Sequence, residues 1–105
     1  MTAMERFRVE VEAHPIVLYM KGTPQYPMCG FSSRIVQALA ACEARYHCVN
    51  VMADPEVRAG LPRFSGWPTF PQLFVNGELI GGCDIALELH EAGELKRMAA
   101  EAQRG

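Results

Sequence analysis

The chain has 105 residues, of which 50% are apolar and 21% are charged. Ten Lys and Arg residues against twelve Asp and Glu residues give a formal net charge of -2. This composition excludes a disordered chain and predicts one folded globular domain over residues 1–105. Charges of both signs are mixed along the chain, so we expect no binding surface for nucleic acid and none for a membrane.

No apolar run of the chain approaches the roughly 20 residues needed to cross a bilayer. The N-terminus also lacks the basic segment and the long apolar segment of a secretory signal. We therefore expect a cytoplasmic protein whose four cysteines are reduced thiols. These cysteines form no C-x2-C pair and no H-x3-5-H follows them, which argues against a structural zinc site.

The first half of the chain alternates between helical and extended patterns. A continuous apolar, partly β-branched run from Ile16 to Met20 predicts a strand buried on both faces. One glycine and two prolines predict the loop that follows it. The elements expected here are a short amphipathic helix (4–13), a strand (16–20), a loop (21–28), a helix (30–43) and a second strand (45–51).

The second half carries clear start and turn signals. Asp54, Pro55 and Glu56 predict a helix start, because they favour the cap, the first turn and the positive end of the helix dipole. Asn76–Gly77 is a hairpin signal, and Asp84 is expected to cap a later helix. The expected elements are a helix from 55 to about 64, a loop (65–71), two paired strands (72–75 and 78–81), a helix that ends at Gly93 and a last helix (94–102).

This order of elements predicts an α/β fold. The β-α-β opening implies two parallel strands, and the late hairpin adds antiparallel strands to the same sheet. We therefore expect a thioredoxin-like domain, with a four-stranded mixed sheet flanked by helices.

Cys29 is the first candidate for chemistry. It lies between a loop and the expected N-terminal turn of a helix, where free N–H groups and the helix dipole stabilise a thiolate. Lys21, at the end of the preceding strand, can reach the same pocket and lower the thiol pKa further. Ser32 stands where a dithiol redox protein carries its second cysteine, so Cys29 must find its partner in another molecule. The alternative of a buried, inert cysteine is disfavoured by Gly30 and Pro27.

Four motifs resemble those of one family. They are Lys21-Gly22-Thr23-Pro24, Cys29-Gly30-Phe31-Ser32, Trp67-Pro68-Thr69-Phe70-Pro71-Gln72-Leu73 and Gly81-Gly82-Cys83-Asp84. In this order and at these spacings they resemble the monothiol glutaredoxins of the CGFS class. The similarity covers essentially the whole chain, which is identified as a single-domain member of that class.

The resemblance implies a glutathione site. Pro71 is expected to follow a cis peptide bond before the third strand, which turns the backbone of Phe70 toward the bound tripeptide. Lys21 and Arg58 would bind the carboxylates of glutathione, and the start of a later helix would hold its γ-glutamyl end. With Cys29 as the reactive residue, the implied glutathione contacts are Lys21, Cys29, Phe31, Arg58, Phe70, Pro71, Cys83 and Asp84.

Several of these residues leave alternatives open. Arg58 could be only a solvated helix charge, and Asp84 only a helix cap. Cys83 could form a disulfide with Cys29, as the matching cysteine can in some relatives, although a backbone contact to glutathione is the simpler role. Trp67 is expected to shape the loop beside the pocket rather than to bind the ligand.

The remaining cysteines and the histidines are not assigned to chemistry. Cys42 and Cys48 are expected to be small core hydrophobes. His14, His47 and His90 have no acid–base partner visible in the sequence, so we expect them to be structural or surface residues.

Three functions remain open. The resemblance implies first a [2Fe–2S] cluster, because Cys29 and one glutathione sulfur from each of two subunits supply the four thiolates that such a cluster needs. This glutathione-bridged homodimer would carry clusters to apo iron–sulfur proteins in iron homeostasis. The second function is a monothiol oxidoreductase, at most weakly active, that removes glutathione from mixed disulfides. The third is an iron-sensing partner of BolA-type proteins.

Overall fold

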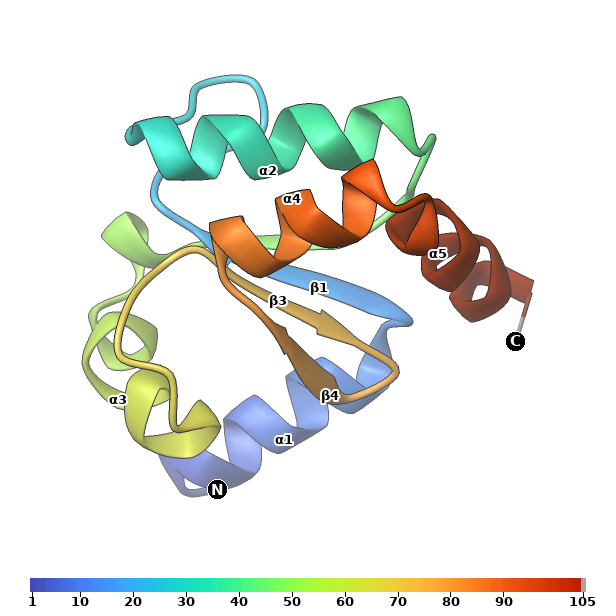
Figure 1. Ribbon diagram of the computed structural model, residues 1–105. Helices are drawn as coiled ribbons and strands as arrows, with labels where there is room; N and C mark the ends of the chain where they lie inside the picture. Colours follow the sequence, from blue (N-terminus) through green and yellow to red (C-terminus); the bar gives the residue numbers. More distant parts are fainter. Residues whose placement is uncertain (105) are drawn as a thin grey trace.

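The computed structural model describes residues 1–104, which form five α-helices around one four-stranded sheet (Figure 1). In chain order the elements are α1 (Ala3–Ala13), β1 (Ile16–Met20), α2 (Gly30–Ala41), β2 (His47–Asn50), the 3₁₀ helix η1 (Val51–Ala53), α3 (Pro55–Ser65), β3 (Gln72–Val75), β4 (Glu78–Gly81), α4 (Cys83–Glu91) and α5 (Glu94–Arg104). This order agrees with the predicted one, to which it adds η1. Among the helices of residues 1–104, none is both long and apolar enough to span a membrane.

The sheet has the strand order β2-β1-β3-β4. β2 lies parallel to β1, whereas β3 is antiparallel to both β1 and β4. The four-stranded mixed sheet predicted from the sequence is therefore confirmed. Asn76 and Gly77, which join β3 to β4, have φ angles of 52° and 79°, as the predicted hairpin turn requires.

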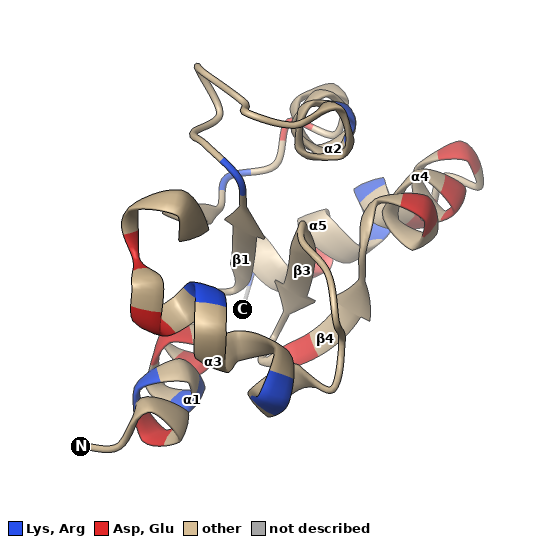
Figure 2. Cartoon of the chain, turned by 90° about the vertical axis from the view of Figure 1, so that its left-hand side faces the viewer, with Lys and Arg blue, Asp and Glu red and all other residues tan. Residues whose placement is uncertain are grey.

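Helices cover both faces of the sheet (Figure 2). α2, α4 and α5 pack on one face, whereas α1 and α3 pack on the other. Side chains alternate along β1, so Ile16, Leu18 and Met20 join the first apolar cluster. Val17 and Tyr19 join the second cluster. All five residues are buried, which confirms the central strand predicted from the apolar run.

α2 ends earlier than the sequence predicted, at Ala41 instead of residue 43. Glu43 adopts a left-handed conformation, with φ of 55°. The amide of Ala44 donates to the carbonyl of Leu39, and the amide of Glu43 donates to that of Ala40. This pair of hydrogen bonds is a Schellman cap, in which glutamate occupies the position that glycine usually takes.

The second predicted strand is also shorter than expected. β2 ends at Asn50, and Val51 already belongs to η1. The side chain of Asn50 accepts a hydrogen bond from the amide of Met52 at 3.0 Å, which caps the start of the 3₁₀ turn. A local side-chain contact therefore ends the strand.

The predicted cap of α4 is wrong. The helix begins at Cys83, so Gly82 occupies the cap position, no side chain caps the helix, and Asp84 is its second residue. Asp84 is exposed and still favours the positive end of the helix dipole. The predicted cap of α3 is confirmed, because Asp54 accepts a hydrogen bond from the amide of Val57 at 3.3 Å. α5 continues two residues beyond its predicted end.

The histidines, which were expected to be structural or surface residues, have partners that are not visible in the sequence. The rings of His14 and His47 stack with their centroids 4.0 Å apart, and His47 Nε2 lies 3.3 Å from Glu10 Oε2. His90 Nδ1 lies 3.7 Å from the sulfur of Cys42. The partners of His47 and His90 are 37 and 48 residues away along the chain, so only the tertiary fold reveals them.

Candidate functional site

A pocket of about 690 Å³ opens where the N-terminal ends of α2 and α4 approach α3. Its lining comes from four separate segments, which lie within residues 21–31, 58–62, 67–71 and 82–85. All eight residues that the sequence proposed as glutathione contacts line this pocket. The fold therefore brings together Lys21 of the first segment and Asp84 of the last, which are 63 positions apart along the chain.

Cys29 is half-buried at the N-cap of α2. Its sulfur accepts a hydrogen bond from the amide of Ser32 at 3.4 Å and lies 3.7 Å from the Ser32 hydroxyl. Burial alone would raise the pKa of the Cys29 thiol. The Ser32 amide and hydroxyl, the amide of Phe31 and the charge of Lys21 outweigh burial and hold this pKa below its ordinary value. Cys29 is therefore placed where a thiolate is stabilised.

Ser32 does more than occupy the place of a second cysteine. Its side chain is fully buried, and its hydroxyl accepts a hydrogen bond from the amide of Lys21 at 3.2 Å. Buried hydroxyl groups need such partners. Ser32 thereby connects the residue that follows β1 to the first turn of α2, which the sequence did not predict.

The loop between β1 and α2 is held by contacts of its own. The amide of Met28 donates to the carbonyl of Lys21 at 2.9 Å, and the amide of Gly22 donates to the Asn50 side chain at 2.9 Å. Gly22 has φ of 93°, and a Cβ there would lie 2.4 Å from the carbonyl oxygen of Tyr26. Only glycine fits this position without a rearrangement.

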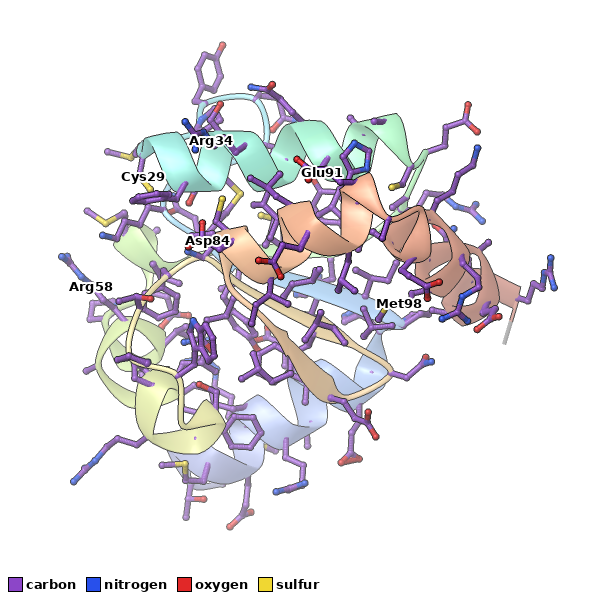
Figure 3. All side chains as sticks on the ribbon, in the orientation of Figure 1. Cys29, Arg34, Arg58, Asp84, Glu91 and Met98 are labelled. Atoms are coloured by element: carbon purple, nitrogen blue, oxygen red, sulfur yellow. The ribbon has the colours of Figure 1, made fainter. Side chains whose placement is uncertain are left out.

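Charged side chains of both signs line the pocket. Lys21 follows β1, Arg58 projects from α3 and Asp84 lies in the first turn of α4. Figure 3 shows Arg58 and Asp84 on the same side of the molecule as Cys29. Within residues 1–104, none of the three charged side chains takes part in an ion pair. This arrangement suits a ligand that carries both carboxylate and ammonium groups.

Residues 67–71 form one wall of the pocket. The peptide bond between Phe70 and Pro71 is cis, as the resemblance implied. The buried amide of Gln72 donates to the carbonyl of Trp67 at 2.9 Å and to that of Thr69 at 3.1 Å. Trp67 is half-buried and lines the pocket together with its loop, and its role in shaping this loop stays a prediction.

The other three cysteine thiols have raised pKa values, in contrast to Cys29. Burial, followed by the charge of Asp84, raises the pKa of Cys83, which is buried in the pocket wall. Burial also raises the pKa of Cys42, and that of Cys48 to about 11. Cys42 is a core residue, as predicted, and the half-buried Cys48 packs against the same cluster.

Metal-ligand types do not gather into a closed site in the described part of the chain. Between residues 1 and 104, no three His, Cys, Asp or Glu side chains form a group that could hold a metal ion. All four cysteines are free thiols. The described part of one chain therefore holds no complete set of metal ligands.

Comparison with known families shows to which family this fold belongs. The family model for glutaredoxin matches residues 16–80, a span that contains the four strands from β1 to nearly the end of β4 and includes Cys29. The chain belongs to the glutaredoxin family. Its thioredoxin-like fold, which the sequence predicted, is thereby confirmed.

Individual relatives resemble this glutaredoxin along nearly its whole length. Glutaredoxin 4 of Escherichia coli (strain K12) is 50% identical over 100 residues, which cover 95% of this chain and 87% of the relative. The holo form of glutaredoxin C1 from Populus tremula x tremuloides has a TM-score of 0.86 at 26% identity, with 98% of this chain and 91% of that chain covered. The buckwheat glutaredoxin–glutathione complex has a TM-score of 0.83 at 29% identity, with 96% and 90% covered.

Sequence reasoning missed the residues that hold the pocket in shape. Gly82 is one of them, because a Cβ there would lie 3.1 Å from Trp67 Nε1; the glycine pair before Cys83 was a usable signal for such a close approach. The anchoring roles of Asn50 and Gln72 carry no signal of their own in the sequence, since amide side chains are common in loops and at strand ends.

Proposed function

We propose that this glutaredoxin is a monothiol member of the CGFS class, that residues 1–105 act as one domain, and that the pocket around Cys29 binds glutathione. Gly105 lies outside the described residues. One observation carries the proposal: the pocket presents a single thiol with a lowered pKa, and the buried Ser32 stands in the place of its partner. A thiolate without a second cysteine in its motif acts with thiols of other molecules.

Glutathione matches the charges of the pocket. It carries two carboxylates, one ammonium group and one thiol. Lys21 and Arg58 would bind the carboxylates, and Asp84 the ammonium group. A volume of about 690 Å³ lies within the usual range of small-molecule sites, about 300 to 1,000 Å³. The structurally similar crystal structure from buckwheat is that of a glutaredoxin–glutathione complex. The remaining proposed contacts are Cys29, Phe31, Phe70, Pro71 and Cys83.

We further propose that two copies of the chain carry a [2Fe–2S] cluster between them as cargo. Such a cluster is commonly held by four thiolates. The donor set of one chain fits a shared site, because Cys29 has a lowered pKa whereas burial raises the pKa of Cys42, Cys48 and Cys83. Two Cys29 thiolates and two glutathione sulfurs would complete the set. Exchangeable ligands of this kind suit delivery to apo iron–sulfur proteins.

Anaerobic reconstitution with iron, sulfide and glutathione tests this function. The wild-type protein should become coloured and elute as a dimer in size-exclusion chromatography, and both changes should require glutathione. Cys29→Ala should remain a colourless monomer, whereas Cys48→Ala, a matched change away from the pocket, should behave as the wild type. A colourless wild-type monomer would exclude cluster carriage, and a normal cluster in Cys29→Ala would exclude Cys29 as a ligand of the cluster.

A second candidate function is removal of glutathione from mixed disulfides, which the lowered pKa of Cys29 favours. The Cys29 thiolate would attack the glutathione sulfur, break the mixed disulfide and release the client thiolate. A second glutathione thiolate would then attack the glutathionylated Cys29, which frees the Cys29 thiolate and forms glutathione disulfide. Steady-state turnover of a glutathionylated peptide by the cluster-free protein measures this activity. Slow turnover supports a carrier, and robust turnover that depends on Cys29 supports an enzyme.

A BolA-type protein is the proposed partner through which the same dimer would sense iron. Cluster transfer to an apo-ferredoxin, with and without such a partner, separates the two uses of the cluster. Transfer that the partner leaves unchanged supports carriage, and transfer that the partner blocks supports sensing.

A further inference from the structure

Gln72 is an uncharged polar residue in the interior of the protein. It is the first residue of β3 and pairs with Tyr19 of the central strand. Its side chain has no exposed surface. Burial of an amide without hydrogen bonds is costly. Since Gln72 Oε1 has no hydrogen-bond partner within the described residues, the partners of Nε2 indicate why a glutamine occupies this position.

Both partners of the Gln72 amide belong to the wall of the pocket. Gln72 Nε2 donates to the carbonyl of Trp67 at 2.9 Å and to the carbonyl of Thr69 at 3.1 Å. These two carbonyls flank Pro68, whose peptide nitrogen carries no hydrogen to donate. One side chain therefore binds the backbone on both sides of this proline.

The same wall is positioned at its two ends by other contacts. The Ser65 hydroxyl accepts a hydrogen bond from the amide of Trp67 at 3.1 Å. At Gly82 a Cβ would lie 3.1 Å from Trp67 Nε1 and 3.3 Å from the carbonyl oxygen of Pro71, so the wall packs tightly against the start of α4. Between these ends, the amide of Gln72 is the polar contact that fixes the backbone from the core side.

We propose that Gln72 is a positioning residue for ligand binding: without touching the ligand, its amide holds residues 67–70 in the conformation that places the Phe70 backbone in the pocket. The inference rests on the proposed glutathione site and extends it to a residue that does not line the pocket. Loss of the amide removes two hydrogen bonds from the wall, so residues 67–70 should become more mobile. Glutathione must then order them on binding, which lowers its affinity.

Gln72→Met tests the proposal, because methionine keeps the length of the side chain and removes its hydrogen bonds. Trp67 is the one tryptophan of the sequence, so its fluorescence reports on the wall alone. We expect about ten-fold weaker glutathione binding by isothermal titration calorimetry, as two neutral hydrogen bonds would account for. Stern–Volmer quenching of Trp67 by acrylamide should increase in the same variant.

Val75→Ala provides the matched control. Val75 is buried at the other end of β3, so its truncation should lower stability but leave glutathione affinity and Trp67 quenching unchanged. If both variants weaken binding and increase quenching equally, the effect is general loosening and the proposal is overturned. Unchanged affinity and quenching in Gln72→Met would overturn it as well.

Gln72→Glu decides the question if Gln72→Met does not fold. An ionised carboxylate would repel the two carbonyls, whereas the protonated form can donate one hydrogen bond. Glutathione affinity relative to wild type at the same pH should therefore recover as pH falls, and an affinity ratio that does not change with pH would contradict the proposal. If the wild type itself fails to bind glutathione, the proposed function fails, and Trp67 quenching alone decides the role of Gln72.

Discussion

The hydroxyl of Ser32 joins two parts of the pocket that are distant along the chain. It accepts a hydrogen bond from the Lys21 amide at 3.2 Å and lies 3.7 Å from the sulfur of Cys29. The first contact holds the end of β1 against α2, and the second stabilises the thiolate. Compared with a dithiol motif, position 32 lacks the second thiol. Its buried hydroxyl nevertheless contributes both contacts to the site.

Ser32→Ala should therefore raise the pKa of Cys29, because the thiolate loses one hydrogen bond. The Lys21 amide also loses its partner, so the free energy of unfolding should fall by about 1 to 2 kcal/mol. Since the folded-state pKa of Cys29 is lowered, its reactivity is present above that pKa and is lost as pH falls through it. In the variant this loss should occur at higher pH. The rate of alkylation by iodoacetamide as a function of pH measures the change.

Ser33→Ala is the control for this prediction. Ser33 lies next to Ser32 on α2 and accepts a hydrogen bond from Gln37 on the exposed face of the helix. Its loss should leave the pH profile of Cys29 unchanged. Identical profiles for Ser32→Ala and wild type would show that the Ser32 hydroxyl does not stabilise the thiolate.

Individual site residues differ in how far the sequence could predict them. Cys29, Lys21 and Asp84 were predictable because a reactive or charged group inside a recognisable motif usually serves the chemistry of that motif. The contact between Ser32 and Lys21 was not, because it joins residues 11 positions apart across a loop. For Gln72, local pattern gives no hint whether an amide faces solvent or the core.

At the scale of an element, the start of α4 shows how a wrongly predicted helix cap changes the interpretation of Asp84. Its cap is Gly82, which offers no side chain, and Asp84 remains exposed in the first turn. Because the Asp84 carboxylate does not cap the N-terminus of α4, it is available to a ligand. The helix thus presents free N–H groups and a carboxylate at the same edge of the pocket.

Asp84→Asn should weaken glutathione binding roughly ten-fold, because a charge-assisted contact to the ammonium group becomes a neutral one. Stability should change by less than about 1 kcal/mol, since only the interaction with the helix dipole is lost. Calorimetric titration and chemical unfolding measure the two quantities. Glu88→Gln, on the exposed part of the same helix, should change neither. A large loss of stability with unchanged affinity would instead assign Asp84 to the helix.

Helix and strand types were predictable from periodicity, but several boundaries were not, and the ends of α2 and β2 show why. α2 ends in a Schellman cap whose left-handed residue is Glu43, and sequence reasoning looks for glycine there. β2 gives way to η1 because Asn50 accepts the amide of Met52. In both cases a side chain or backbone geometry outside the usual signals ends the element.

At the scale of the whole molecule, ion pairs between side chains connect α1 and α3, the two helices on one face of the sheet. Arg6 of α1 forms an ion pair with Asp54, the cap of α3, and a second one with Glu56 at 2.6 Å. These groups are partly exposed, so the ion pairs contribute only moderately to the stability of the fold. The hydrogen-bonded guanidinium of Arg6 is the main cause that lowers the pKa of Asp54.

Arg6→Gln should lower the free energy of unfolding by about 1 kcal/mol at neutral pH. Because the folded-state pKa of Asp54 lies below its ordinary value of 3.8, this stabilisation is present above 3.8 and is lost as pH falls through the lowered pKa. The difference between wild type and variant should therefore shrink in acid. Urea unfolding at neutral and acidic pH measures it. Arg8→Gln removes a 3.7 Å ion pair within α1 and a guanidinium that lies 5.6 Å from the centre of the Phe64 ring, and its effect on stability should not shrink in acid to a comparable extent. A stability difference for Arg6→Gln that persists in acid would contradict the ionic explanation.

Because the pocket is built from four segments of the chain, the free energy of unfolding depends on whether a ligand occupies it. Its walls come from residues within 21–31, 58–62, 67–71 and 82–85, which meet only in the native state. A molecule that fills the pocket therefore binds the folded chain and not the unfolded one, and its binding energy adds to the stability of the fold in proportion to the logarithm of its concentration. We therefore expect the temperature of thermal unfolding to rise with the concentration of a ligand that fills this pocket, and to fall back when that ligand is removed.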